Sequence, residues 1–185
     1  MRERVKWIYS SQNAERRSSR EAGSCMSSAR ILVVEDYEPF QRFIRSTLEK
    51  KPELQVICSV SDGLEAVQKA EELQPDLILL DIGLPTLNGI DAARRIGKVA
   101  PQSKILFLSQ ESSPDVAEEA LALGALGYVI KIHAGIELLA AVEAVCQGRR
   151  FVSAALAGHV PAEGRRQGPK RHPGEALAPT SEAGD

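Results

Sequence analysis

The sequence predicts an α/β protein with a doubly wound, five-stranded parallel sheet. Between residues 30 and 153, an apolar run of strand length alternates five times with a segment whose apolar residues recur at helical spacing. The central run, residues 77–80, reads LILL without polar alternation, so both of its faces are expected to be covered by helices. Strand and helix in such alternation build a parallel sheet with right-handed crossovers.

The strands and helices follow one another in a regular order. Each strand is an apolar run, and each helix is placed where apolar residues recur three or four positions apart. Asp62 and the pair Ser113-Pro114 are typical of helix N-termini. The predicted strands are residues 31–34, 54–60, 77–80, 104–108 and 126–130. The predicted helices are residues 40–48, 64–73, 90–99, 114–123 and 135–147, and the apolar stripe of the last one is expected to be Ile136, Leu139, Val142 and Val145.

The length of 185 residues suits one domain with some remainder. We expect a basic, flexible extension over residues 1–29, the domain over 30–153, and a disordered tail over 154–185, because the outer segments lack apolar periodicity. Met26 precedes the first strand and is a second candidate for the start of translation. A net charge of −2 gives no overall attraction to nucleic acid or acidic lipid.

The cysteines and the basic N-terminus bear on location. Cys25, Cys58 and Cys146 are too few and too scattered for a disulfide framework or a zinc site. No apolar run of the length needed for a secretory signal follows the basic start. We therefore expect a cytoplasmic protein that does not associate with membranes.

Polar residues end four of the five predicted strands. Glu35 and Asp36 follow the first strand, Asp81 the third, Ser109 the fourth and Lys131 the fifth. Each has an ordinary alternative as a turn former, loop hydroxyl or surface charge, but parallel strands bring their carboxyl ends to one edge of the sheet. Strands lie about 4.8 Å apart, so acids from neighbouring strands can share a cation. Oxygen ligands beside a phosphate group favour Mg²⁺.

Four segments resemble the receiver domain of bacterial two-component response regulators, in particular the branch of nitrate-type regulators. They are ILVVED (31–36), LILLDIGLP (77–85), ILFLS (105–109) and YVIK (128–131). The resemblance covers residues 30–153 in order and spacing. It implies a flavodoxin-like receiver fold with strand order 2-1-3-4-5.

The resemblance also implies a function and a metal site. Asp81 would accept a phosphoryl group from a sensor histidine kinase or a phosphotransfer protein, so that the chain acts as a phosphorylation-dependent switch in a phosphorelay. Mg²⁺ would be bound by Asp81, by Asp36 directly, by Glu35 through water and by the Gly83 carbonyl. The chain would accept phosphoryl on its own side chain and would not be an enzyme for a separate substrate.

Three further residues take roles from the resemblance. Lys131 and Ser109 would contact the phosphoryl oxygens, and Tyr128 would move inward together with Ser109. Two positions depart from the family pattern: Gln110 is bulkier than the small residue common there, and Ile132 replaces a common proline. These departures leave the lifetime of the phosphoryl group open.

The resemblance leaves the output open. No recognition helix is visible after residue 153, so we expect a protein contact through the face formed by residues 114–123, 126–130 and 135–147, and no nucleic-acid binding by this chain alone. One alternative is a transcriptional regulator of the nitrate-regulator type whose DNA-binding domain is lost or supplied by another chain. Another is a degenerate receiver that serves as a fixed interaction module. Whether the chain forms a homodimer, through the face that contains the last helix, is left open.

Overall fold

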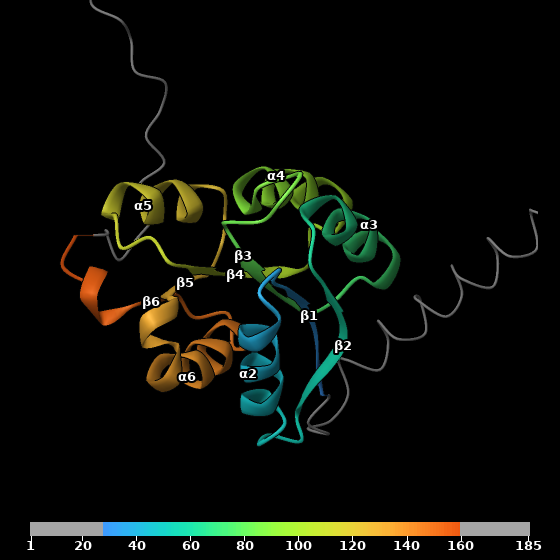
Figure 1. Ribbon diagram of the computed structural model, residues 1–185, viewed down its shortest axis with the longest axis horizontal. Coiled ribbons are helices and arrows are strands. Elements are labelled where there is room, and N and C mark those ends of the chain that lie inside the picture. The colour runs from blue at the N-terminus through green and yellow to red at the C-terminus, as the bar shows by residue number, and fades with distance from the viewer. Residues whose placement is uncertain (1–27, 160–185) are drawn as a thin grey trace, which may run out of the picture.

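In the computed structural model, residues 28–159 are described, and they form a parallel sheet between two layers of helices (Figure 1). The sheet has six strands in the order β2-β1-β3-β4-β5-β6. The strands are β1 (Ala29–Val34), β2 (Leu54–Val60), β3 (Leu77–Asp81), β4 (Lys104–Ser109), β5 (Gly127–Ile130) and β6 (Phe151–Val152). Cys25, Met26, most of the predicted extension and most of the predicted tail lie outside the described residues.

The parallel sheet and the order of its first five strands are confirmed, but the predicted number of strands is wrong. Phe151 and Val152 pair in parallel with Gly127 and Tyr128 of β5 and add a sixth strand at the edge. Two half-buried residues cannot show a periodic pattern, so this strand leaves no signal in the sequence. The described chain then continues through a 3₁₀ turn, Ala154–Leu156, and Leu156 is buried against the core.

Helices cover both faces of the sheet. They are α2 (Glu38–Leu48), α3 (Gly63–Leu73), α4 (Gly89–Val99), α5 (Pro114–Ala122) and α6 (Ala134–Cys146). Figure 1 shows α3, α4 and α5 on one face and α2 and α6 on the other. Asp62 caps α3 as predicted, since its carboxylate accepts from the Leu64 and Glu65 N–H groups. Ser113 precedes α5 but makes no capping hydrogen bond through its side chain.

The predicted apolar stripe of α6 is partly wrong. Ile136 is 89% exposed, whereas Leu138 and Ala141 are buried together with the correctly predicted Val142 and Val145. Because apolar residues surround most of this helix, helical spacing alone allowed two stripes, and packing on the sheet selected the one through Leu138.

Strand β3 contributes side chains to the two hydrophobic cores, one on each face of the sheet. Leu77 and Leu79 pack with the α2 and α6 layer, and Ile78 and Leu80 with the α3, α4 and α5 layer, all with no exposed surface. Asp81 is therefore the point at which the most buried strand reaches the edge of the sheet. Among residues 28–159, no helix has both the length and the apolar character needed to cross a bilayer.

Candidate functional site

Three carboxylates gather at the carboxyl edge of the sheet. Strands β1 and β3 are neighbours, and Val34 lies opposite Leu80. Glu35 and Asp36 come directly after Val34, and Asp81 comes directly after Leu80, so all three acids lie at the same place on the edge of the sheet. One ligand oxygen from each lies within 4.8 Å of the others. Glu35 and Asp81 are buried, and Asp36 is exposed. The structure thus brings together the acids that the sequence pattern predicted at one edge.

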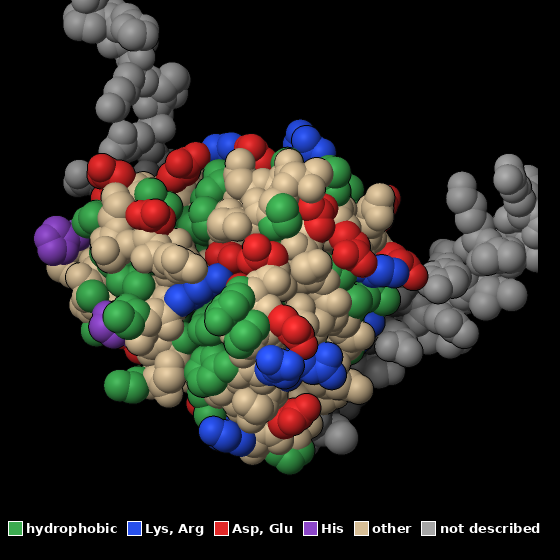
Figure 2. All heavy atoms as spheres, in the orientation of Figure 1, with side chains coloured by type: hydrophobic (Ala, Val, Ile, Leu, Met, Phe, Trp, Pro, Cys, Tyr) green, Lys and Arg blue, Asp and Glu red, His purple; other side chains and the backbone are tan. Residues whose placement is uncertain are grey.

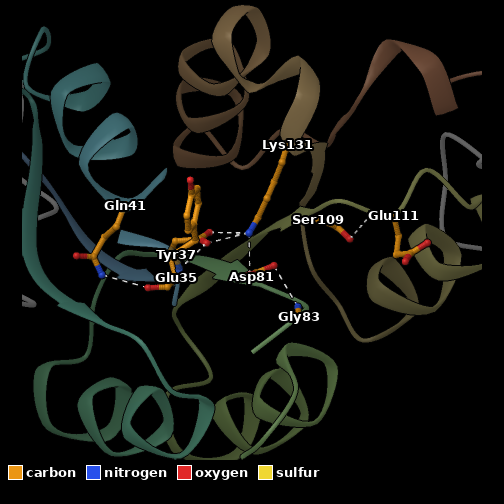
Figure 3. Close-up of polar contacts among 8 residues, drawn as sticks. All are labelled: Glu35, Tyr37, Gln41, Asp81, Gly83, Ser109, Glu111 and Lys131. Atoms are coloured by element: carbon orange, nitrogen blue, oxygen red, sulfur yellow. Dashed lines mark hydrogen bonds and ion pairs between the residues drawn. The ribbon is translucent and has the colours of Figure 1, made fainter. Parts of the chain in front are cut away.

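Lys131 reaches the same cluster from the end of β5 (Figure 3). Its Nζ lies 2.8 Å from Asp81 Oδ2 and 2.9 Å from Glu35 Oε1. The ammonium also lies 5.0 Å from the centre of the Phe40 ring, which favours a cation there. Three carboxylates and one ammonium leave two uncompensated negative charges when all four groups are ionised.

Glu35 is a buried carboxylate beside a second one, Asp81. Burial raises the pKa of its carboxyl above the usual 4.5, and neighbouring Asp81 raises it further, while the hydrogen bond from Lys131 opposes the shift. The Tyr37 N–H donates to Glu35 Oε1 at 3.2 Å, and Gln41 Nε2 donates to the Glu35 carbonyl at 3.2 Å. Sequence reasoning missed Tyr37, Gln41 and Phe40, because their contacts depend on how α2 begins.

The loop after β3 folds back onto the phosphoacceptor candidate. The Gly83 N–H donates to Asp81 Oδ1 at 3.1 Å, and the Gly89 N–H donates to the Ile82 carbonyl at 2.9 Å. A Cβ on Gly89 would lie only 2.0 Å from the Asp81 carbonyl oxygen. The two carboxylate oxygens of Asp81 therefore have different partners, a backbone amide for Oδ1 and an ammonium for Oδ2.

Ser109 and Tyr128 lie beside the charged cluster and meet at Glu111. Ser109 is buried at the end of β4, and its Oγ accepts from the Glu111 N–H at 3.0 Å. Tyr128 is fully buried, and its hydroxyl donates to the Glu111 carbonyl at 2.9 Å. Burial raises the pKa of Tyr128, so its hydroxyl remains a neutral donor. Figure 3 shows Ser109 turned toward Glu111.

Comparison with known proteins gives one consistent result. The family model of the response regulator receiver domain matches residues 31–143. The chain is 32% identical to the transcriptional regulatory protein LiaR of Bacillus subtilis over 148 residues, which are 80% of this chain and 70% of LiaR. It is 40% identical over 110 residues to a protein-glutamate methylesterase/protein-glutamine glutaminase of Thermotoga maritima, which are 59% of this chain and only 32% of that protein.

Solved structures agree with this result. A LuxR-family two-component response regulator from Aurantimonas sp. SI85-9A1 is 33% identical, with a TM-score of 0.69, and the match covers 72% of this chain and 96% of that one. The signal receiver domain of the putative response regulator NarL from Mycobacterium tuberculosis is 25% identical, with a TM-score of 0.63, over 66% of this chain and 99% of that one.

Proposed function

The chain belongs to the response regulator receiver domain family and is a phosphorylation-dependent signalling protein, and on that premise we propose that Asp81 is its phosphoacceptor. The donor would be a phosphohistidine on a sensor kinase or a phosphotransfer protein. The observation that carries the proposal is the placement of Asp81, which is buried at the sheet edge with Lys131 on one oxygen and the Gly83 N–H on the other.

We assign Mg²⁺ to the acidic cluster, with Asp36 and Asp81 as direct ligands, Glu35 as a ligand through water and the Gly83 carbonyl as a further ligand. A divalent ion offsets the two uncompensated negative charges. One oxygen of each acid lies within 4.8 Å of the others, and carboxylate and carbonyl oxygens with waters are the ligands that Mg²⁺ takes, so the residues fit the ion. When bound, the ion supplies positive charge to phosphoryl oxygens.

Asp81, Lys131 and Ser109 would each have a separate role in phosphoryl transfer. An Asp81 oxygen attacks phosphorus, and the bond from phosphorus to the donor histidine nitrogen breaks. Lys131, already paired with Asp81, exchanges a carboxylate partner for a phosphoryl oxygen. Ser109 turns its hydroxyl from the Glu111 N–H to another phosphoryl oxygen. Each residue acts by position and charge, which is what this reaction requires.

The same movement suggests an output. Releasing the Glu111 N–H loosens the segment between β4 and α5, and the Tyr128 hydroxyl, which is bound to the Glu111 carbonyl, has to follow. This supports a partner surface on α5, β5 and α6. The alternative output is that of a transcriptional regulator of the nitrate-regulator type whose DNA-binding domain is lost or supplied by another chain. The chain spans 70% of the transcriptional regulatory protein LiaR. Three further statements stay predictions: that the chain can form a homodimer, that it is cytoplasmic, and that it does not act on a separate substrate.

The direct test is phosphorylation by a small donor. Incubating the chain with acetyl phosphate and Mg²⁺ should add the mass of one phosphoryl group, and chelating the metal with EDTA should prevent the addition. Hydroxylamine should remove the group, as it cleaves acyl phosphates. If no mass is gained at saturating Mg²⁺, the chain is a fixed interaction module and not a switch.

The raised pKa of Glu35 makes Mg²⁺ binding dependent on pH. Protons and the cation compete for the Glu35 carboxylate. The affinity for Mg²⁺ is therefore full above the folded-state pKa of Glu35, which lies above the usual 4.5, and it falls as the pH drops through that pKa. Titrating Mg²⁺ by NMR amide shifts between pH 5 and 8 measures this. In Glu35→Gln, the part of the pH dependence due to Glu35 should disappear; an unaltered profile would contradict the assignment.

An exposed apolar rim beside the site should serve the protein donor. Ile132, next to Lys131, is 83% exposed, Ile136 is 89% exposed and Tyr37 is 62% exposed. Figure 2 shows that hydrophobic side chains lie beside acidic and basic ones near the centre of the face it draws, without distinguishing individual residues. Tyr37 follows Asp36, Ile132 follows Lys131, and Ile136 lies in the first turn of α6. We infer that a protein which brings a phosphohistidine to Asp81 buries these residues.

We expect the double variant Ile132→Ser, Ile136→Ser to slow transfer from a phosphorylated kinase about ten-fold or more, while transfer from acetyl phosphate changes little. Leu123→Ser is the matched control, since Leu123 is 36% exposed at the far end of α5. Equal slowing with both donors would show that the rim affects the site itself and not docking.

A further inference from the structure

The chain has a buried serine just after β6 that the preceding mechanism does not use. Ser153 has no exposed surface. Its N–H donates to the Tyr128 carbonyl at 2.9 Å, which continues the pairing of β6 with β5. A buried hydroxyl is stable only with hydrogen-bond partners, and those of Ser153 lie on both sides of Lys131.

One hydroxyl links the backbone at Ile130 to the side chain of Glu137. Ser153 Oγ accepts from the Ile130 N–H at 2.9 Å and donates to Glu137 Oε2. The other oxygen of Glu137 accepts from the Ala154 N–H at 3.0 Å. Ile130 directly precedes Lys131, and Glu137 lies in the first turn of α6. The segment 130–137, which carries Lys131, is therefore held at both ends by the same side chain.

The hydrogen bond from the Ile130 N–H to the Ser153 hydroxyl takes the place of a backbone hydrogen bond between β5 and β6. β6 ends at Val152, opposite Tyr128, so the next outward-facing amide of β5 has no strand residue to pair with. Ile130 is 2% exposed, and water cannot easily take the place of the serine. On its other side Ile130 lies opposite Ser109 of β4, so this position joins both groups expected to contact the phosphoryl oxygens.

We propose that Ser153 is a positioning residue for Lys131: the Ser153 hydroxyl, oriented by Glu137, fixes the segment 130–137 so that the ammonium stands on Asp81. The inference rests on the proposed function, because it concerns the rate of phosphoryl uptake at Asp81. It adds a requirement that lies outside the receiver motifs, in the segment that follows α6.

The test compares three variants and one control variant of the full chain with acetyl phosphate and Mg²⁺ both saturating. Ser153→Ala should lower the first-order rate of phosphorylation about ten-fold, the scale expected for a displaced catalytic group. Ser153→Thr keeps a hydroxyl and should recover most of the lost rate. Glu137→Gln should give an intermediate loss, and it carries the test if Ser153→Ala does not fold. Ser46→Ala, an exposed serine on α2, is the matched control.

Mg²⁺ affinity separates positioning from general loosening. The proposed ligands follow β1 and β3, and Lys131 competes with a cation for Glu35 and Asp81, so a loosened lysine cannot weaken Mg²⁺ binding. The proposal is supported if Ser153→Ala is phosphorylated slowly while its affinity for Mg²⁺, measured from NMR amide shifts, is undiminished. An unchanged rate, or rate and affinity that fall together, overturns it while leaving the proposed function intact. No uptake by the unaltered chain would overturn both.

Discussion

Asp81→Asn will take up no phosphoryl group from acetyl phosphate, a loss of at least about 100-fold, because an amide oxygen is a far weaker nucleophile than a carboxylate. The variant keeps the size and shape of the side chain. Lys131 retains Glu35 as its ion-pair partner, and Gly83 can still donate to the side-chain oxygen, so we expect the fold to survive. Intact-protein mass spectrometry, with circular dichroism to check folding, gives the answer.

Asp115→Asn is the control for this experiment, since Asp115 is an exposed carboxylate in the first turn of α5. It should be phosphorylated at the rate of the unaltered chain. Phosphoryl uptake by Asp81→Asn at an appreciable rate would place the acceptor elsewhere, with Asp36 as the nearest exposed carboxylate of the cluster.

The strands and the acidic cluster could be predicted because each has a local signal. An apolar run such as Leu77–Leu80 is a strand in almost any parallel sheet, and its end directs Asp81 to the edge. Once parallel order is assumed, Glu35 and Lys131 follow by topology, because the carboxyl ends of β1, β3 and β5 lie on one edge. Their meeting needs no knowledge of side-chain conformation.

The features that sequence reasoning missed depend on packing. Nothing local distinguishes Ile136, which is exposed, from Leu138, which is buried, since both lie in one apolar helix. Strand β6 exists because β5 offers it a free edge, and Ser153 acquires its contacts only through that pairing. The orientation of Ser109 toward Glu111 is likewise set by the loop and not by the strand that carries it.

Gly89→Ala should destabilise the fold and disturb the site, although it adds only one methyl group. The new Cβ would lie 2.0 Å from the Asp81 carbonyl oxygen and 2.8 Å from the Ile82 Cα, and both are backbone atoms that cannot rotate away. Either α4 moves outward or β3 shifts at its end, and overpacking of this kind costs about 3 kcal/mol. Urea unfolding should show that loss in the free energy of unfolding.

The position of the clash predicts a second effect. Because Gly89 presses on the residue that carries the phosphoacceptor, molecules that remain folded should also be phosphorylated more slowly. Gly97→Ala is the matched control in the same helix: a Cβ there meets nothing within 4 Å, and replacing glycine inside a helix should stabilise the protein by about 0.5–1 kcal/mol. If both variants unfold at the same urea concentration, the loop does not press on Asp81, and the close approach of α4 to the end of β3 has no part in holding the acceptor in place.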